Sequence, residues 1–144
     1  MDYEVVFSLA NLLALVSWGF LFIFPFRPFT NKVVIGVSVF LLAMVYSYLL
    51  FNALQPIDLA KFKTLPGVMG LFSDKGTVLT GWVHYLAFDL MVGLFIAHNA
   101  AQHGITYLLV FPCLLFTLFL GPFGLLLYLI IRWSLTKQLF TENF

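Results

Sequence analysis

The chain has 144 residues, of which 62% are hydrophobic and only 9% are charged, and its formal net charge is +1. Soluble domains carry about 25% charged residues, so this composition excludes a soluble enzyme, a disordered chain and a nucleic-acid-binding protein with a basic surface. The single cysteine, Cys113, excludes an internal disulfide framework and a cysteine-rich metal cluster. A small membrane protein with several spans is the class that remains.

Two uncharged stretches in the first third of the chain predict two transmembrane helices, which we place at residues 5–25 and 33–54. About 20 apolar residues are needed to cross a hydrocarbon core ~30 Å thick. The first stretch follows two acidic residues, whereas a signal peptide begins with basic ones. We therefore expect the first helix to be retained in the protein.

The connection at residues 55–78 is the longest predicted loop. Its segment 65–72 is mostly apolar and lies between Lys63 and Asp74. An apolar segment bounded by charges is typical of a loop that lies flat in the headgroup layer. A loop packed over the mouth of the helix bundle would explain the same pattern, so both interpretations stay open.

The uncharged run at residues 90–131 is too long for one crossing. A polar cluster at residues 102–104 contains glycine and marks the place where the chain folds back. The third and fourth spans are therefore predicted at residues 79–100 and 105–132. The whole chain is predicted to be all-α, a single domain built as an integral membrane bundle of four transmembrane helices.

Two residues shape the expected fourth span. Pro122, which follows Gly121, cannot donate a backbone hydrogen bond, so we expect a kink there. Arg132 closes the span, and we expect its side chain to extend to the membrane interface.

The distribution of Lys and Arg predicts the orientation of the chain. Cytoplasmic loops are enriched in these residues. With both termini cytoplasmic, the inner side would hold Lys61, Lys63, Lys75, Arg132 and Lys137, and the outer side Arg27 and Lys32. We therefore predict that both termini are cytoplasmic.

Asp89 is the strongest candidate functional residue because it lies inside the third predicted span. An ionisable group at that depth costs about 2.5–3.5 kcal/mol on insertion scales. Helical geometry places it on one face with Trp82, Tyr85 and Gly93, which can line a pocket. Carboxyl groups in low dielectric exchange protons near neutral pH, which suits acid/base catalysis. The alternative is a buried polar anchor that accepts hydrogen bonds from Tyr85 or from another helix.

His84 is the second candidate for proton transfer, since histidine titrates near neutral pH. It lies about 140° around the helix from Asp89, so the two would flank one cavity only if the third span is central. For His84 taken alone, a structural role is the simpler explanation. Asn11 of the first span either contributes to the site or forms an interhelical hydrogen bond. His84, His98 and His103 lack metal-ligand spacing, so we predict no metal site.

The stretch Gly81–Leu90, which reads GWVHYLAFDL, resembles the signature of the abscisic-acid-deficient-4-like family, which includes plant neoxanthin synthase. The resemblance extends over nearly the whole chain. It includes residues 10–11, Trp18, residues 66–73, residues 118–128 and Arg132.

The resemblance implies a membrane protein of four spans with no known cofactor. In plants the family is associated with the conversion of violaxanthin to neoxanthin, which opens an epoxide to an allene. That reaction removes a proton from carbon and gives a proton to the epoxide oxygen. Asp89 and His84 match signature positions, so the resemblance assigns catalysis to them. Substrate binding would then fall to Trp82, Tyr85, Gly93 and Asn11.

Two functional hypotheses follow. The first is a cofactor-free isomerase that acts on a carotenoid or other isoprenoid lipid. The second is a non-catalytic membrane protein that binds such a lipid or a partner membrane enzyme. Both place the protein in a lipid bilayer with no nucleic-acid partner, and both leave room for an oligomer. The short chain has no obvious organellar transit peptide, so we expect a bacterial member in the inner (cytoplasmic) membrane.

Overall fold

The computed structural model describes residues 2–53 and 59–137, and all regular structure within them is helical. Helix α1 (Tyr3–Ile23) begins where the Asp2 carboxylate accepts a hydrogen bond from the backbone N–H of Glu4. The chain then turns before Pro28. This helix confirms the first predicted apolar span.

The second long helix consists of three consecutive segments, α2 (Pro28–Val33), the π-helical η1 (Val34–Val39) and α3 (Phe40–Ala53). It packs beside α1, where the Ser17 hydroxyl donates a hydrogen bond of 2.6 Å to the hydroxyl of Ser38. Both serines are buried. This buried pair of hydroxyl groups therefore joins the two apolar helices.

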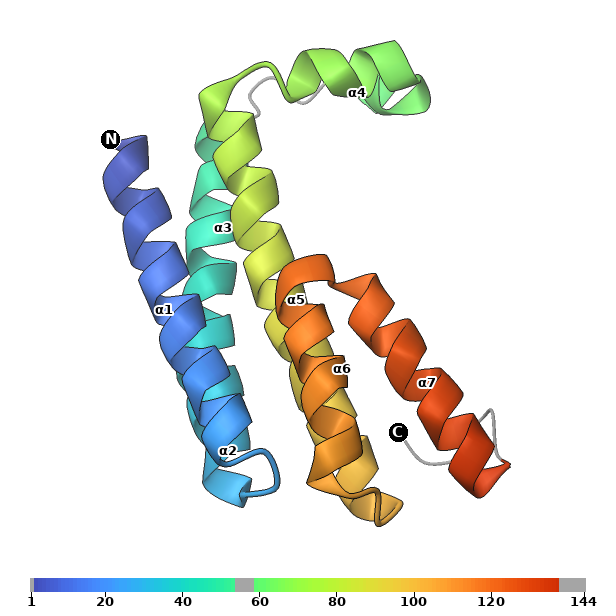
Figure 1. Ribbon diagram of the computed structural model, residues 1–144. Helices are drawn as coiled ribbons and strands as arrows, with labels where there is room; N and C mark the ends of the chain where they lie inside the picture. Colours follow the sequence, from blue (N-terminus) through green and yellow to red (C-terminus); the bar gives the residue numbers. More distant parts are fainter. Residues whose placement is uncertain (1, 54–58, 138–144) are drawn as a thin grey trace.

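Helix α5 (Lys75–Gln102) is the central element, and it packs against α1, α3, α6 and α7 (Figure 1). Its first turn is capped by Asp74, whose carboxylate accepts a hydrogen bond from the backbone N–H of Thr77. It ends at the predicted fold-back, where Gly104 adopts a φ of +64°. Together with α1 and the second long helix, it is long and apolar enough to cross a membrane.

The predicted fourth span at residues 105–132 is not a single helix. It is divided into α6 (Tyr107–Leu120) and α7 (Pro122–Thr136). The two helices form a hairpin, because Gly124 lies against Thr117 and Cys113 of α6. Each helix has 14 or 15 residues, a length of about 21–23 Å. Neither helix alone spans a hydrocarbon core of ~30 Å. At Gly121 and Pro122, where a kink was expected, the chain reverses its direction instead.

The hairpin changes where the charges lie. The N-terminus of α1 and the last described residues of α7 are at opposite ends of the bundle (Figure 1). This differs from the expected arrangement, in which both termini lie on one side. Three cations lie at the end of the bundle that holds the N-terminus and four at the other, instead of five against two. The first group is Lys61, Lys63 and Lys75, and the second is Arg27, Lys32, Arg132 and Lys137.

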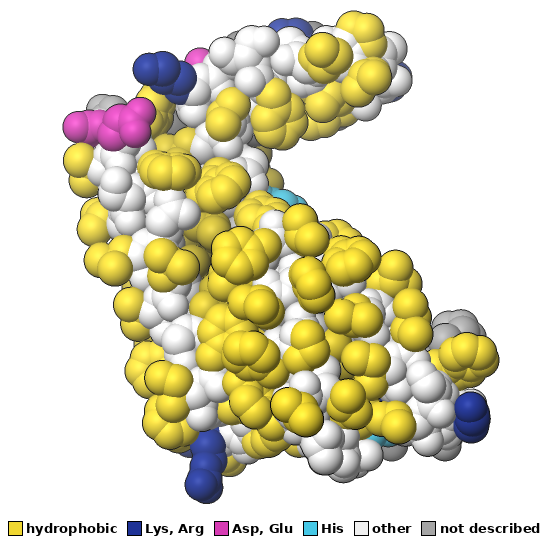
Figure 2. Space-filling model, in the orientation of Figure 1, with side chains coloured by type: hydrophobic (Ala, Val, Ile, Leu, Met, Phe, Trp, Pro, Cys, Tyr) yellow, Lys and Arg dark blue, Asp and Glu magenta, His cyan; other side chains and the backbone are white. Residues whose placement is uncertain are grey.

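The loop predicted at residues 55–78 contains the short helices η2 (Leu59–Lys63) and α4 (Leu65–Leu71), while residues 54–58 lie outside the described part. Helix α4 lies crosswise at the end of the bundle (Figure 1). None of its residues is buried, and Leu65 is 73% exposed. Hydrophobic side chains on α4 overhang a recess above α6 and α7 (Figure 2). This arrangement suits a segment in the headgroup layer.

Candidate functional site

The Asp89 carboxylate lies where α5 meets the junction of α6 and α7. The residue is 7% exposed. A methyl group added to Gly121 would be 2.8 Å from Oδ1 of Asp89, so the carboxylate lies directly against the glycine backbone. Among the described residues, Oδ2 of Asp89 has no hydrogen-bond partner. A buried polar atom without a partner costs free energy, which makes this carboxylate a candidate functional group.

Gly121 is required at this junction for two reasons. Its φ is +48°, a backbone conformation that residues other than glycine rarely adopt. Its missing Cβ also leaves the space that the Asp89 carboxylate occupies. Pro122 follows as the first residue of α7 and cannot continue the hydrogen bonding of α6. The glycine and the proline together place the tip of the hairpin against the middle of α5.

Three predicted site residues form a connected row beside Asp89. The side chain of Tyr85, one turn earlier on α5, interacts with the Asp89 carboxylate. The rings of Tyr85 and Trp82 have their centroids 5.5 Å apart. Nε1 of Trp82 donates a hydrogen bond of 3.0 Å to Oδ1 of Asn11 on α1. The structure therefore brings Trp82, Tyr85 and Asp89 together on one face of α5, with Asn11 of α1 bonded to the first of them.

Gly93 lies one turn beyond Asp89, where α1 packs against α5. A Cβ at this position would be 2.7 Å from Cη2 of Trp18, whose side chain is 2% exposed. The missing side chain thus admits the Trp18 ring of the neighbouring helix. Gly93 was predicted to line a pocket beside Asp89, and the space beside it holds side chains of α1.

His84 lies away from Asp89. Its exposed ring stacks on Phe88, with centroids 4.5 Å apart, and lies 5.5 Å from the ring of Tyr46 on α3. Asp89 contacts Gly121 instead. The third span is central, as the prediction required, but His84 and Asp89 contact different helices.

A second polar cluster fastens α7 to α5, and the sequence did not predict it. Oδ1 of Asn99 accepts hydrogen bonds from the Tyr128 hydroxyl at 2.6 Å and from Nη1 of Arg132 at 3.0 Å. All three residues are buried. Arg132 was expected to extend to the interface, but the hairpin brings it back against α5. Only the reversal at Gly121 places these residues together.

The remaining histidines lie at the far end of α5. His98 contacts Gln102 at 3.0 Å, and Nδ1 of His103 lies 2.8 Å from the carbonyl oxygen of Asn99. Within residues 2–53 and 59–137, no group of three or more His, Cys, Asp or Glu is arranged to hold a metal ion.

The model of the family described as ABA DEFICIENT 4-like matches residues 5–128, which is more than half of the chain. No curated protein and no solved structure matches. The matched range includes most of α1, the whole central helix, the hairpin tip and the Asp89 site.

Proposed function

The chain belongs to the ABA DEFICIENT 4-like family, and we propose that it is an integral membrane isomerase, without a cofactor, that acts on a carotenoid or other isoprenoid lipid. The observation that carries the proposal is the Asp89 carboxylate, which is buried in an apolar helix with Oδ2 lacking a partner among the described residues. Placing a carboxylate inside a membrane costs free energy, and ionisable residues at that depth commonly take part in the function of the protein.

The substrate and the product of the proposed reaction contain the same atoms, so no second substrate is needed. In an isomerisation of an epoxide to an allene, one proton leaves carbon, a carbon–oxygen bond breaks and the oxygen gains one proton. A base and an acid in the same place are sufficient. The reaction is neither an oxidation nor a reduction, so its balance requires no cofactor.

Asp89 and Tyr85 fit these two roles, since their side chains interact. Asp89 would take the proton from carbon, and the Tyr85 hydroxyl would give its proton to the oxygen. The protonated carboxyl group can then return a proton to the phenolate, which restores both groups. The interaction between the two side chains thus allows the catalytic cycle to close.

His84 takes a secondary place in this proposal. Its exposed ring beside Phe88 and Tyr46 offers a polar aromatic surface to the same lipid from the α3 side. We therefore expect His84→Gln to lower turnover less than Asp89→Asn does. An equal loss in the two variants would return His84 to the proton-transfer step.

The second candidate function is lipid or partner binding without catalysis. The contact between Asp89 and the Gly121 backbone favours it, because the carboxylate would then act as a fixed polar contact for the hairpin tip. Under that alternative, the shape of the side chain matters and its ability to exchange a proton does not.

The substitution Asp89→Asn separates the two functions, since asparagine keeps the shape but cannot exchange a proton near neutral pH. The protein would be assayed in lipid nanodiscs for isomerisation of an epoxidised carotenoid. We expect turnover to fall by roughly 10²- to 10⁴-fold, the range for loss of a general acid or base. The matched control is Asp74→Asn, which keeps the cap of α5 and should keep turnover.

The melting temperature of each variant shows whether the fold survives. If Asp89→Asn does not fold, Tyr85→Phe removes the proposed acid and leaves the ring in place. Full turnover in folded Asp89→Asn would exclude Asp89 from catalysis. A bound lipid without any turnover in the wild type would support the binding function.

A further inference from the structure

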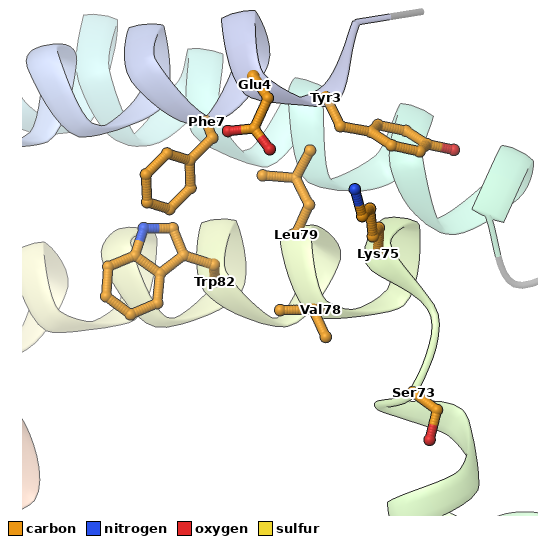
Figure 3. A pocket seen from close by; sticks show the side chains of 8 residues that line it. All are labelled: Tyr3, Glu4, Phe7, Ser73, Lys75, Val78, Leu79 and Trp82. Atoms are coloured by element: carbon orange, nitrogen blue, oxygen red, sulfur yellow. The ribbon is translucent and has the colours of Figure 1, made fainter.

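A pocket of about 370 Å³ opens where the N-terminus of α1 meets the first turns of α5 (Figure 3). Its walls are largely apolar, with Phe7 contributed by α1 and Val78 and Trp82 contributed by α5. The ring centroids of Phe7 and Trp82 lie 5.8 Å apart, so the two helices form one aromatic wall together. The proposed isomerisation at Asp89 gives this pocket no role.

Two opposite charges face this pocket without pairing with each other. The Glu4 side chain projects from α1 and the Lys75 side chain from α5, both toward the space between the helices (Figure 3). In the described part of the chain, no ion pair joins Glu4 to Lys75. The carboxylate and the ammonium group can therefore each bind a group of opposite charge inside the same pocket.

A ligand that carries both an ammonium group and a phosphate matches this pair best. A lone phosphate would be attracted by Lys75 but repelled by Glu4, and a lone amine would be attracted by Glu4 but repelled by Lys75. A neutral alcohol would leave both side chains without a counter-charge. A zwitterion places an opposite charge beside each of them, and both contacts can be charge-assisted hydrogen bonds.

The pocket lies at the depth of phospholipid headgroups. Helix α5 has 28 residues, so its length of about 42 Å equals the thickness of a bilayer with its headgroups, about 40–45 Å. Lys75 is the first residue of α5 and therefore lies in the headgroup layer. Trp82 is about 10 Å further along the helix, where the acyl chains begin. The charged and apolar parts of the pocket thus follow the order of a phospholipid.

We propose that the pocket binds a zwitterionic phospholipid, with its ammonium group beside Glu4 and its phosphate beside Lys75. One acyl chain then lies along Phe7, Val78 and Trp82. The apolar walls favour a lipid over a soluble zwitterion, because burial of apolar surface would add nothing to the binding of a headgroup alone. This lipid site goes beyond the proposed isomerase activity and does not depend on it.

Quenching of Trp82 fluorescence by brominated acyl chains measures occupancy of the pocket. Trp133, which is 51% exposed, would be replaced by Phe, while Trp18 is 2% exposed and shielded from lipid. The protein would be placed in vesicles of equal parts phosphatidylethanolamine and phosphatidylglycerol, with bromine on the chains of one lipid or of the other. We expect the association constant of phosphatidylethanolamine to be about two- to fivefold larger, the range for an exposed ion pair.

A second series of vesicles tests the other charge. Phosphatidylglycerol is replaced by a cationic lipid that has an ammonium group and no phosphate, and the wild type should again prefer phosphatidylethanolamine about two- to fivefold. Glu4→Gln should lose only the preference over phosphatidylglycerol, because its amide no longer repels an anionic headgroup. Lys75→Gln should lose only the preference over the cationic lipid. This crossed pattern is specific to a pocket that holds both charges.

Two matched variants control for the charge of this end of the molecule. Asp2→Asn removes an acidic group next to α1, and Lys61→Gln removes a cation from η2, and neither residue lines the pocket. Both variants should keep both preferences. The melting temperature of every variant checks that the fold survives.

Each contrary result has a definite meaning. Equal association constants of the wild type for phosphatidylethanolamine and phosphatidylglycerol would overturn the proposal. Loss of the preferences in Asp2→Asn or Lys61→Gln would also overturn it, since the field of the whole end would then select the lipid. Displacement of the brominated lipid by soluble glycerophosphoethanolamine at equal concentration would show that the pocket takes a free zwitterion and not a phospholipid.

Discussion

The contact between Asp89 and Gly121 shows how a costly residue is accommodated inside an apolar helix. A carboxylate that faced lipid would lose its hydration without any compensation. In this protein the carboxylate faces a backbone turn where no side chain occupies the space. The position is protected from lipid, and one oxygen remains available for chemistry or for a bound group.

Gly93 provides a residue-scale prediction about packing. Gly93→Leu should destabilise the protein by about 1–3 kcal/mol, because the new side chain would meet the buried ring of Trp18. The free energy of unfolding would be measured by titration with a denaturing detergent. Gly19→Leu is the control, since a Cβ at Gly19 meets nothing within 4 Å. Equal stability of the two variants would contradict the packing of Trp18 against Gly93.

Asn99 provides a second prediction at this scale. Asn99→Leu should cost about 1–3 kcal/mol, since the buried Tyr128 hydroxyl and Arg132 would lose the same acceptor atom. Asn52→Leu is the control, because Asn52 is exposed and its side chain donates only to the Tyr48 carbonyl of its own helix. The same detergent titration would measure both. A larger cost for Asn52→Leu than for Asn99→Leu would argue against the cluster.

At the scale of elements, the hairpin of α6 and α7 is the unit that completes the site. Its tip lies against Asp89, and its far end is fastened to α5 through Asn99. Within the tip, Gly124 allows α7 to lie directly on Thr117 of α6. The position of the tip therefore depends on the glycines at 121 and 124 and on the hydrogen bonds to Asn99 at the far end of the hairpin.

A double-mutant cycle tests the tip. Gly121→Ala should cost about 1–3 kcal/mol from backbone strain at positive φ, with a further cost from the contact between the new methyl group and Asp89. In an Asp89→Ala background only the strain remains, so Gly121→Ala should cost less there. Unfolding free energies of the four proteins give the coupling. A coupling of zero would show that the carboxylate does not lie against Gly121.

At the scale of the whole molecule, the side of the membrane on which each end of the chain lies depends on the last apolar stretch, whose two short helices do not cross the bilayer completely. Three helices are long enough to span a membrane, and the hairpin returns toward the end from which α6 starts. With three against four cations at the two ends, the Lys and Arg count no longer favours cytoplasmic termini. The expected location in a bacterial inner membrane remains a prediction.

Cysteine labelling tests this topology. Single cysteines at Asp2 and at Lys137, in a Cys113→Ser background, would be exposed to a membrane-impermeant reagent on intact and on opened vesicles. We expect the two positions to react from opposite sides. Reaction from the same side would mean that residues 105–132 cross the membrane completely, as a continuous span would.

The sequence by itself determined the class of the protein, three long helices and the residue on which the site depends. Long runs without charge can bury their backbone in lipid only as helices, and the glycine-containing cluster at residues 102–104 ends one of them. Asp89 stood out because a charge is rare at that depth. Helical periodicity also placed Trp82, Tyr85 and Gly93 on its face, since that depends on local geometry alone.

Only the tertiary structure decided how the last apolar stretch folds and what each face of α5 meets. A single span and a pair of short helices have the same hydropathy, so composition does not distinguish them. The reversal depends on the packing of Gly124 on Thr117 and on the bonds from Tyr128 and Arg132 to Asn99. The separation of His84 from Asp89 likewise depends on which helices pack on the two sides of α5, and such long-range contacts have no local signal in the sequence.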